Sequence, residues 1–255
     1  MNINKFYKDN GYLELEVITS DLCDIVNEKI ERLIDSGDYK ENTKIYKYND
    51  SPRIIESWKY IPEIIDIANS SEIISTLTKL YGRKPLPFST INFIKGSNQP
   101  LHSDYVHFGS IPEGFLCGVW IALEDIQEGS GELQVGLGTN DGWPIFRYAD
   151  HGLKKPGSLS DIKKNYSYYE DWVKEKVSNE KTEIKKCYLK KGQALFWDHN
   201  LLHGGAKVTN SHLTRKSLVI HYHFDKTIAY NPNFSFYDGD NYEKRHFKII
   251  GETNE

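Results

Sequence analysis

The chain has 255 residues, of which 38% are hydrophobic and 27% are charged, and this balance excludes collagenous, low-complexity and wholly disordered proteins. Its formal net charge of -4 argues against a protein that holds nucleic acid by bulk charge. We find no apolar run of about 18 residues that would cross a membrane, and we expect no secretory signal. The three cysteines, Cys23, Cys117 and Cys187, form no CxxC pair, so we expect a cytoplasmic protein without a disulfide framework.

Helices are predicted in the first third of the chain. Residues 19–37 carry apolar side chains at i, i+3 and i+4 spacing, with Ser20 as a candidate N-cap and Gly37 suited to the position after the helix. Residues 62–81 predict one or two further helices. The stretch 38–60 is polar and aromatic, and we expect it to be irregular.

After residue 84 the pattern changes to short segments that are rich in β-branched and aromatic residues and are mostly separated by turn residues. These segments are PLPFSTINFIKG, FLCGVWIALED, ELQVGL, TEIKKCYLKKG, QALFWDH and KSLVIHYHF. Strands that follow an initial helical region predict a β-sandwich or barrel with helices on one side. Residues 138–182 interrupt the strands and include a helical stretch near 161–178. Because an insertion of this length is often a lid or a binding loop, we expect it to cover or border the mouth of a pocket.

A first candidate metal site is the motif His102-Ser103-Asp104. On a strand, residues i and i+2 point to the same face, so this imidazole and this carboxylate can converge on one ion. The motif alone is a weak signal, because a second copy exists at His223-Phe224-Asp225. Non-haem iron enzymes combine two histidines and one carboxylate on one face of the metal.

The candidate for the second histidine is His203, which follows the predicted strand 193–198 and precedes Gly204 and Gly205. Glycines at these positions let the backbone approach a site closely. His199 is the alternative, and it lacks the adjacent glycines. The pair His221 and His223 also resembles a cupin-like HxH motif, although we favour an interior or substrate-pocket role for it.

Arg215 comes twelve residues after His203 and opens the predicted strand RKSLVIHYHF. By the period of two, Arg215, Ser217, Val219 and His221 share one face. A buried, unpaired arginine costs several kcal/mol. A carboxylate such as the distal group of 2-oxoglutarate would remove this cost by a bidentate hydrogen bond, to which Ser217 could add another. The alternative is an exposed arginine at a strand end.

With these motifs in order, the chain resembles the phytanoyl-CoA dioxygenase family of iron(II)- and 2-oxoglutarate-dependent oxygenases. The resemblance rests on NGYLELEV, LHSDYVHFGS, GVWIALEDIQEGSGELQV, GQALFWDHNLLHGGAKV and TRKSLVIHYHF, which together bracket almost the whole chain. It implies iron ligands at His102, Asp104 and His203, and 2-oxoglutarate anchored by Arg215.

The resemblance also places Trp120 in the co-substrate pocket, and we assign Asn92 and Ser217 to the same site. Two positions depart from the family pattern: Ser103 stands where glutamine is frequent, and Gly205 stands where a small polar residue is frequent. Neither departure removes a metal ligand. Both concern the finer contacts to 2-oxoglutarate.

The fold that the resemblance implies is mainly β: a double-stranded β-helix, or cupin-like jelly roll, with N-terminal helices. We expect one domain over residues 1–255. Its parts are a mainly helical flank (1–83), a jelly-roll core (84–225) that carries the long insertion, and a C-terminal extension (226–255).

The expected reaction is hydroxylation of a small polar metabolite or biosynthetic intermediate. Iron(II) is the bound cofactor, 2-oxoglutarate and dioxygen are consumed, and succinate and carbon dioxide are released. Tyr105, His107, Trp143, Arg147 and His151 are candidate substrate contacts, and ordinary loop packing is their alternative role. Two other functions stay open: a metal-binding jelly-roll module without activity, and a cupin-type isomerase or 2-oxoglutarate-independent dioxygenase. The sequence leaves the oligomeric state undetermined.

Overall fold

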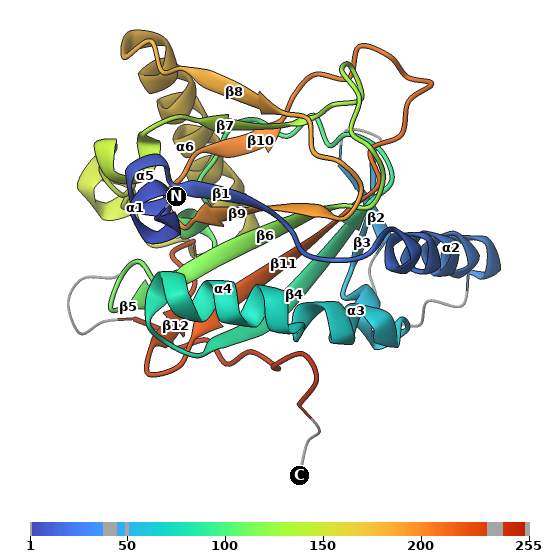
Figure 1. Cartoon of the computed structure of the whole chain (residues 1–255). Coiled ribbons are helices and arrows are strands. Elements are labelled where there is room, and N and C mark those ends of the chain that lie inside the picture. The colour runs from blue at the N-terminus through green and yellow to red at the C-terminus, as the bar shows by residue number, and fades with distance from the viewer. Residues whose placement is uncertain (1, 38–44, 49–50, 234–241, 253–255) are drawn as a thin grey trace.

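Two antiparallel sheets face one another in the computed structural model, which describes residues 2–37, 45–48, 51–233 and 242–252 (Figure 1). The major sheet has seven strands in the order β1-β9-β6-β11-β4-β3-β2, and the minor sheet has three in the order β10-β7-β8. A further pair, β12-β5, lies beside them. The sheet strands are β1 (Tyr12–Glu16), β2 (Ile45–Tyr48), β3 (Ser51–Ile55), β4 (Pro85–Phe93), β5 (Gly109–Ile111), β6 (Leu116–Ala122), β7 (Leu133–Gly136), β8 (Ile184–Cys187), β9 (Gln193–Asp198), β10 (His203–Gly205), β11 (Ser217–Phe224) and β12 (Ile228–Tyr230).

The helices lie mostly outside the two sheets (Figure 1). They are α1 (Ile3–Asn10), α2 (Ser20–Ser36), α3 (Pro62–Ala68), α4 (Ser71–Tyr81), α5 (Thr139–Gly142) and α6 (Leu159–Asn179), with 3-10 turns η1 (Ser57–Lys59), η2 (Asp104–Val106) and η3 (Tyr148–His151). None of these helices has the length and apolar character needed to cross a membrane. The predicted jelly roll with N-terminal helices is confirmed.

The major sheet is buried on both faces, and β6 shows how its sequence achieves this. Val119 and Ile121 point toward the core that α2, α3 and α4 form on the outer face. Trp120 and Ala122 point the other way, into the core between the two sheets. Because successive side chains alternate between faces, a strand that is buried on both must be apolar throughout. All seven residues of β6 are buried accordingly.

The N-terminal helices begin and end close to the predicted positions. Helix α2 ends before Gly37, whose φ of 66° is the left-handed conformation that glycine favours. Its N-cap is Thr19 and not Ser20, because the Thr19 hydroxyl accepts the Leu22 N–H at 3.3 Å. The predicted stretch 62–81 forms two helices, α3 and α4. Helix α1 was not predicted.

The expectation that residues 38–60 are irregular is wrong where the structure describes them. Strands β2 and β3 extend the major sheet, and η1 follows. Strand β3 pairs with β4, so that Arg53 lies opposite Phe93. This partner lies far away in the sequence, and a local pattern of apolar residues cannot reveal it. Residues 38–44 and 49–50 lie outside the described residues.

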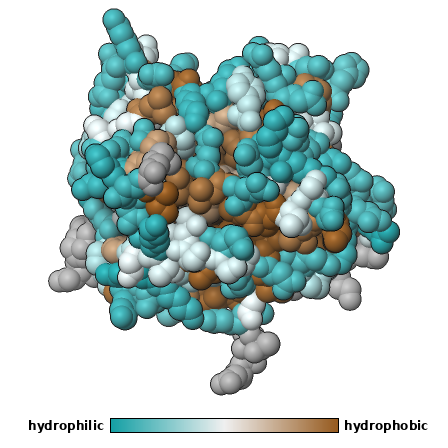
Figure 2. Space-filling model, viewed as in Figure 1, coloured by the Kyte–Doolittle hydropathy of each residue, from teal (hydrophilic) through white to brown (hydrophobic). Residues whose placement is uncertain are grey.

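The insertion at 138–182 forms a separate aromatic cluster with α6 as its main helix, and α6 contains the predicted helical stretch. Tyr169 of α6 accepts the backbone N–H of Ser103 at 2.7 Å, so the insertion supports the candidate metal motif from behind. Figure 2 shows that hydrophilic residues cover most of the face seen in Figure 1, with a band of hydrophobic residues across its middle.

The close packing of Gly118 on Trp197 predicts that a larger residue at position 118 lowers the stability of the protein. Gly118 lies opposite Trp197 in the β6–β9 pair, and a Cβ atom at Gly118 would overlap the Trp197 indole. We expect Gly118→Ala to lower the free energy of unfolding by about 1–3 kcal/mol, the usual cost of overpacking a core. Chemical denaturation measures this cost.

The matched control for this prediction is Gly142→Ala, because a Cβ atom there meets nothing within 4 Å. Gly142→Ala should leave the stability within about 0.5 kcal/mol of the natural protein. Equal stabilities for the two variants would contradict the close packing of Trp197 on Gly118.

Candidate metal and co-substrate site

A backbone bridge joins the two candidate histidines directly. The His102 N–H donates to the His203 carbonyl, and the His203 N–H donates to the His102 carbonyl, both at 2.9 Å. The centres of the two imidazole rings are 4.5 Å apart. His102 belongs to this isolated bridge and Asp104 begins η2, so the motif is a bridge and a turn instead of the regular strand that we expected.

Both imidazole rings are oriented for metal binding. The Nδ1 atom of His102 lies 3.0 Å from the Pro100 carbonyl oxygen, and Nδ1 of His203 lies 3.0 Å from that of Leu201. A carbonyl oxygen can only accept, so each Nδ1 carries a proton, and Nε2 is the ring atom that is placed for a metal ion. Burial and the neighbouring His203 lower the pKa of His102 to about 3, which keeps this ring neutral.

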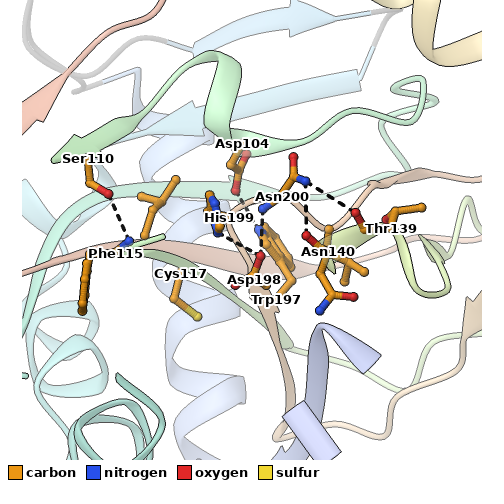
Figure 3. Close-up of polar contacts among 12 residues, drawn as sticks. Asp104, Ser110, Phe115, Cys117, Thr139, Asn140, Trp197, Asp198, His199 and Asn200 are labelled. Atoms are coloured by element: carbon orange, nitrogen blue, oxygen red, sulfur yellow. Dashed lines mark hydrogen bonds and ion pairs between the residues drawn. The ribbon is translucent and has the colours of Figure 1, made fainter. Parts of the chain in front are cut away.

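The two oxygen atoms of the Asp104 carboxylate have different neighbours. Its Oδ2 atom accepts the Trp197 indole N–H at 2.6 Å (Figure 3). The same oxygen lies 3.4 Å from Nε2 of His221. Its Oδ1 atom lies 3.5 Å from Nε2 of His203, on the side of the two candidate ligands. Burial alone would raise the pKa of Asp104, but His203 and His221 hold it well below its usual value, so the group is a carboxylate.

His102, Asp104 and His203 therefore form a set that could hold a metal ion. One ligand atom from each lies within 4.8 Å of the other two. Donor atoms that share one ion lie about 3–4 Å apart, and Asp104 Oδ1 and His203 Nε2, at 3.5 Å, are within this range. Two imidazoles and one carboxylate are the donor set of the facial non-haem iron site, so the residues fit iron(II).

These three residues line a cavity of about 590 Å³ that also receives Arg215. The Arg215 side chain is only 2% exposed, and its Nε has no hydrogen-bond partner within the described part of the chain. Its guanidinium carbon lies 5.1 Å from the centre of the Phe93 ring and 5.6 Å from that of Trp120. Burial and the neighbouring Arg53 lower the pKa of Arg215 to about 10, and it still carries its charge at neutral pH.

This environment fits a carboxylate ligand. The Trp120 indole N–H is also buried, and no residue that the structure describes accepts it. A buried cation and a buried neutral donor, both without acceptors, are costly unless a ligand supplies them. The distal carboxylate of 2-oxoglutarate has the required charge and oxygen atoms.

Arg53 is a cavity residue that the sequence analysis missed. It lines the cavity from β3, and its Nη2 donates to the Gln99 side-chain oxygen at 2.9 Å. The Gln99 amide nitrogen lies 3.0 Å from Nε2 of His102. Gln99 thus connects Arg53 to the candidate metal ligand His102. Nothing in the local sequence marks Arg53, because its position depends on the pairing of β3 with β4.

Two predicted co-substrate contacts lie elsewhere. Asn92 points to the outer face of the major sheet, where its side-chain oxygen accepts the Ser57 hydroxyl, and it does not line the cavity. The alternation along β4 explains this, since the neighbouring residues Ile91 and Phe93 do line the cavity. Ser217 is buried but also outside the cavity lining, and its hydroxyl donates to the Arg215 carbonyl at 3.5 Å.

Among the predicted substrate contacts before the insertion, only His107 lines the cavity. Its Nδ1 lies 2.9 Å from the Asn233 amide nitrogen, and burial lowers the pKa of His107 to about 4. Tyr105 points away from the cavity, and its hydroxyl hydrogen-bonds to Glu113 and Tyr230.

The insertion was expected to cover or border the mouth of a pocket. It contributes no residue to the lining of the described cavity, but it borders the cavity through Tyr166 of α6, whose ring centre lies 5.1 Å from that of the lining residue His107. Trp143 packs against Trp172 with ring centres 5.7 Å apart, and Arg147 pairs with Glu113 at 2.7 Å. His151 stacks on Phe146 with ring centres 4.4 Å apart. Trp143 and His151 thus pack on Trp172 of α6, and Arg147 is held by an ion pair with a residue outside the insertion, so none of the three lines the cavity.

The rival histidines do not join the metal set. His199 lies 2.9 Å from the Asp198 carboxylate, which it faces in Figure 3. His221 lines the cavity but approaches the other oxygen of Asp104, and His223 stacks on Phe88. In the described part of the chain, the three residues whose ligand atoms lie within 4.8 Å of one another are His102, Asp104 and His203.

Comparison with known proteins places these residues in a family. The family model for phytanoyl-CoA dioxygenase (PhyH) matches residues 68–217. A Caenorhabditis elegans protein named probable phytanoyl-CoA dioxygenase is 26% identical over 256 residues, which cover 89% of this chain and 76% of that protein.

Solved structures share the fold. The epimerase SnoN from nogalamycin biosynthesis, in complex with Fe3+, alpha ketoglutarate and nogalamycin RO, has a TM-score of 0.68 at 14% identity, covering 98% of this chain and 94% of its own. The carbocyclase SnoK has a TM-score of 0.63 at 16% identity, with 88% and 84% covered. EctD from S. alaskensis with 2-oxoglutarate and 5-hydroxyectoine has a TM-score of 0.64 at 17% identity, with 87% and 75% covered.

Trp197 generates a prediction for the metal set, because it contacts two of the three candidate ligands. It donates to Asp104 and stacks on His203 with ring centres 4.2 Å apart. Trp197→Phe keeps the stacked ring and removes the hydrogen bond. Since loss of a partner behind a metal ligand typically costs 10–100-fold in affinity, we expect iron(II) affinity to fall by about that factor. Anaerobic equilibrium titration measures it.

The control is Trp172→Phe, which changes the same side chain in the insertion, away from the cavity lining. Its iron(II) affinity should match that of the natural protein. An unchanged affinity in Trp197→Phe would show that the indole hydrogen bond does not orient Asp104.

Proposed function

This chain belongs to the phytanoyl-CoA dioxygenase family, and we propose that it is an iron(II)- and 2-oxoglutarate-dependent dioxygenase that hydroxylates a small metabolite or biosynthetic intermediate. One observation carries the proposal. The candidate metal set and a buried arginine with an unmet donor line the same cavity. The metal set provides the ligands that iron(II) requires, and the buried arginine provides the cation that binds the distal carboxylate of 2-oxoglutarate.

In this proposal His102, Asp104 and His203 bind the ion on one face and leave the opposite face to co-substrate and dioxygen. When bound, iron(II), 2-oxoglutarate and dioxygen supply the oxidising chemistry, with release of succinate and carbon dioxide. Arg215 binds and orients the distal carboxylate of 2-oxoglutarate. The Phe93 and Trp120 rings beside Arg215 exclude water, which strengthens that ionic contact.

Hydroxylation is the reaction that Asp104 favours, because related halogenases lack a carboxylate ligand and bind chloride in its place. The similar structures are named for several outcomes: an epimerase, a carbocyclase and a protein bound to 5-hydroxyectoine. A shared fold therefore accommodates different reactions, and the substrate's position in the cavity selects among them.

A screen of candidate metabolites for succinate release under air tests the proposed function. We expect succinate to form in proportion to an oxidised product, and to require both iron(II) and 2-oxoglutarate. Product without succinate would instead indicate a cupin-type isomerase or a 2-oxoglutarate-independent dioxygenase. Failure to bind 2-oxoglutarate in the presence of iron(II) would indicate a metal-binding module.

Arg215 generates the sharpest prediction for the co-substrate. Removing the charged partner of a buried carboxylate costs about 2–5 kcal/mol, so Arg215→Ala should weaken 2-oxoglutarate binding by roughly 30- to several-thousand-fold. Arg215→Lys should recover only part of this affinity, because an ammonium group cannot reproduce the two-pronged guanidinium contact. Calorimetric titration of 2-oxoglutarate measures both variants, and iron(II) affinity should stay close to that of the natural protein.

The control is Arg32→Ala, which removes an exposed arginine from α2 whose side chain pairs with Glu28. It should bind 2-oxoglutarate normally. An Arg215→Ala curve that overlays this control would remove Arg215 from the co-substrate site.

A further inference from the structure

The cavity is more positive than the chain as a whole. Five guanidinium or ammonium groups line it against two carboxylates, whereas the whole chain has a net charge of -4. The cationic residues are Arg53, Lys59, Arg215, Arg245 and Lys248, and the acidic residues are Glu56 and Asp104. Iron(II) and 2-oxoglutarate would bring two charges of each sign, so they would leave this positive excess unchanged.

The cations form two groups at different places in the cavity. Arg53 and Arg215 lie over the same Phe93 ring, at 5.3 and 5.1 Å from its centre, and they belong to the co-substrate end. Lys59 follows Trp58 in η1, and Arg245 and Lys248 lie on the C-terminal segment. The side chains of this second group are exposed, so they form a rim.

A wall of aromatic rings connects this rim to the candidate metal set. The Phe108 ring lies 5.1 Å from the His221 ring, whose Nε2 is 3.4 Å from Asp104. The Phe88 ring lies 5.2 Å from Phe108 and 4.1 Å from Phe247.

The wall ends at a guanidinium group. The Arg245 guanidinium carbon lies 4.6 Å from the centre of the Phe247 ring and 5.7 Å from that of Phe108. The apolar surface therefore begins beside the reacting centre and ends at a cation.

Arg245 and Lys248 have no carboxylate within ion-pair distance in the part of the chain that the structure describes. The acidic residue on this side, Glu56, already accepts the Trp58 indole N–H at 2.8 Å and the Thr90 N–H at 3.3 Å. An anionic ligand at the rim would supply the negative charge that the protein does not place beside Arg245 and Lys248.

We propose that this outer lobe, defined by Phe88, Phe108, Phe247, Arg245 and Lys248, binds a substrate that carries a carboxylate or phosphate on a flat apolar body. The body packs on the phenylalanine rings, and the anionic group lies at Arg245 and Lys248. The proposal rests on the proposed function, since it names the substrate class of the same cavity. It replaces the general expectation of a polar metabolite with an amphipathic organic anion.

Two probes of equal shape test the charge preference. Equilibrium dialysis of 2-naphthoate and of the neutral 2-naphthamide is carried out anaerobically on the full chain with iron(II) and saturating 2-oxoglutarate. We expect naphthoate to bind about tenfold more tightly than the amide. Arg245→Gln should remove most of this preference and leave amide binding unchanged, because the aromatic wall is intact. Replacing naphthoate by 2-naphthyl phosphate identifies which of the two anions binds better.

Lys244→Gln is the matched control, because it removes one positive charge from the same segment at a residue that does not line the cavity. It should bind naphthoate like the natural protein. Equal binding of the two probes, no binding of either, or an Arg245→Gln variant that keeps the full preference for naphthoate would each overturn the proposal. If the natural protein fails to bind 2-oxoglutarate while its naphthoate binding still depends on Arg245, the co-substrate assignment is refuted and the outer lobe stays in place.

Discussion

The backbone bridge between His102 and His203 is the constraint on which the candidate site depends. It joins the segment after β4 to the first residue of β10, so the main chain sets the distance between the two imidazoles. The bridge needs a close approach of two backbones: a Cβ atom on Gly204 would lie 2.7 Å from the Gln99 carbonyl oxygen. Glycine after His203 is therefore a packing requirement of the site.

Around this bridge, each side chain that fixes the metal set also belongs to the core. Trp197 packs on Gly118 in the major sheet while it holds Asp104, and Tyr169 of the insertion holds the Ser103 N–H. The cavity holds an exception, because Arg215 keeps a buried charged donor that no residue in the described part of the chain accepts. A buried cation without an acceptor is costly unless a ligand supplies one, which is why this donor indicates a ligand site.

Residues whose roles depend on local pattern were predictable from the sequence. The helix at 19–37, the apolar strands and the spacing of His102, Asp104 and the late His203 follow from periodicity and from donor chemistry. Roles that depend on distant pairing were not. Arg53 reaches the cavity because β3 adds to the sheet beside β4, and Arg245 reaches it because the C-terminal segment returns to the rim. Asn92 was misplaced for a related reason, since one residue of register decides which face a strand side chain occupies.

The most direct test of the account is an anaerobic titration with iron(II) followed by 2-oxoglutarate, monitored by visible absorption. The account predicts a weak charge-transfer band that requires both additions, reaches saturation at one iron and one 2-oxoglutarate per chain, and disappears in His203→Ala. A band of the same intensity in His203→Ala, or no band in the natural protein when both components are present, would contradict the assignment of His102, Asp104 and His203 as the iron site.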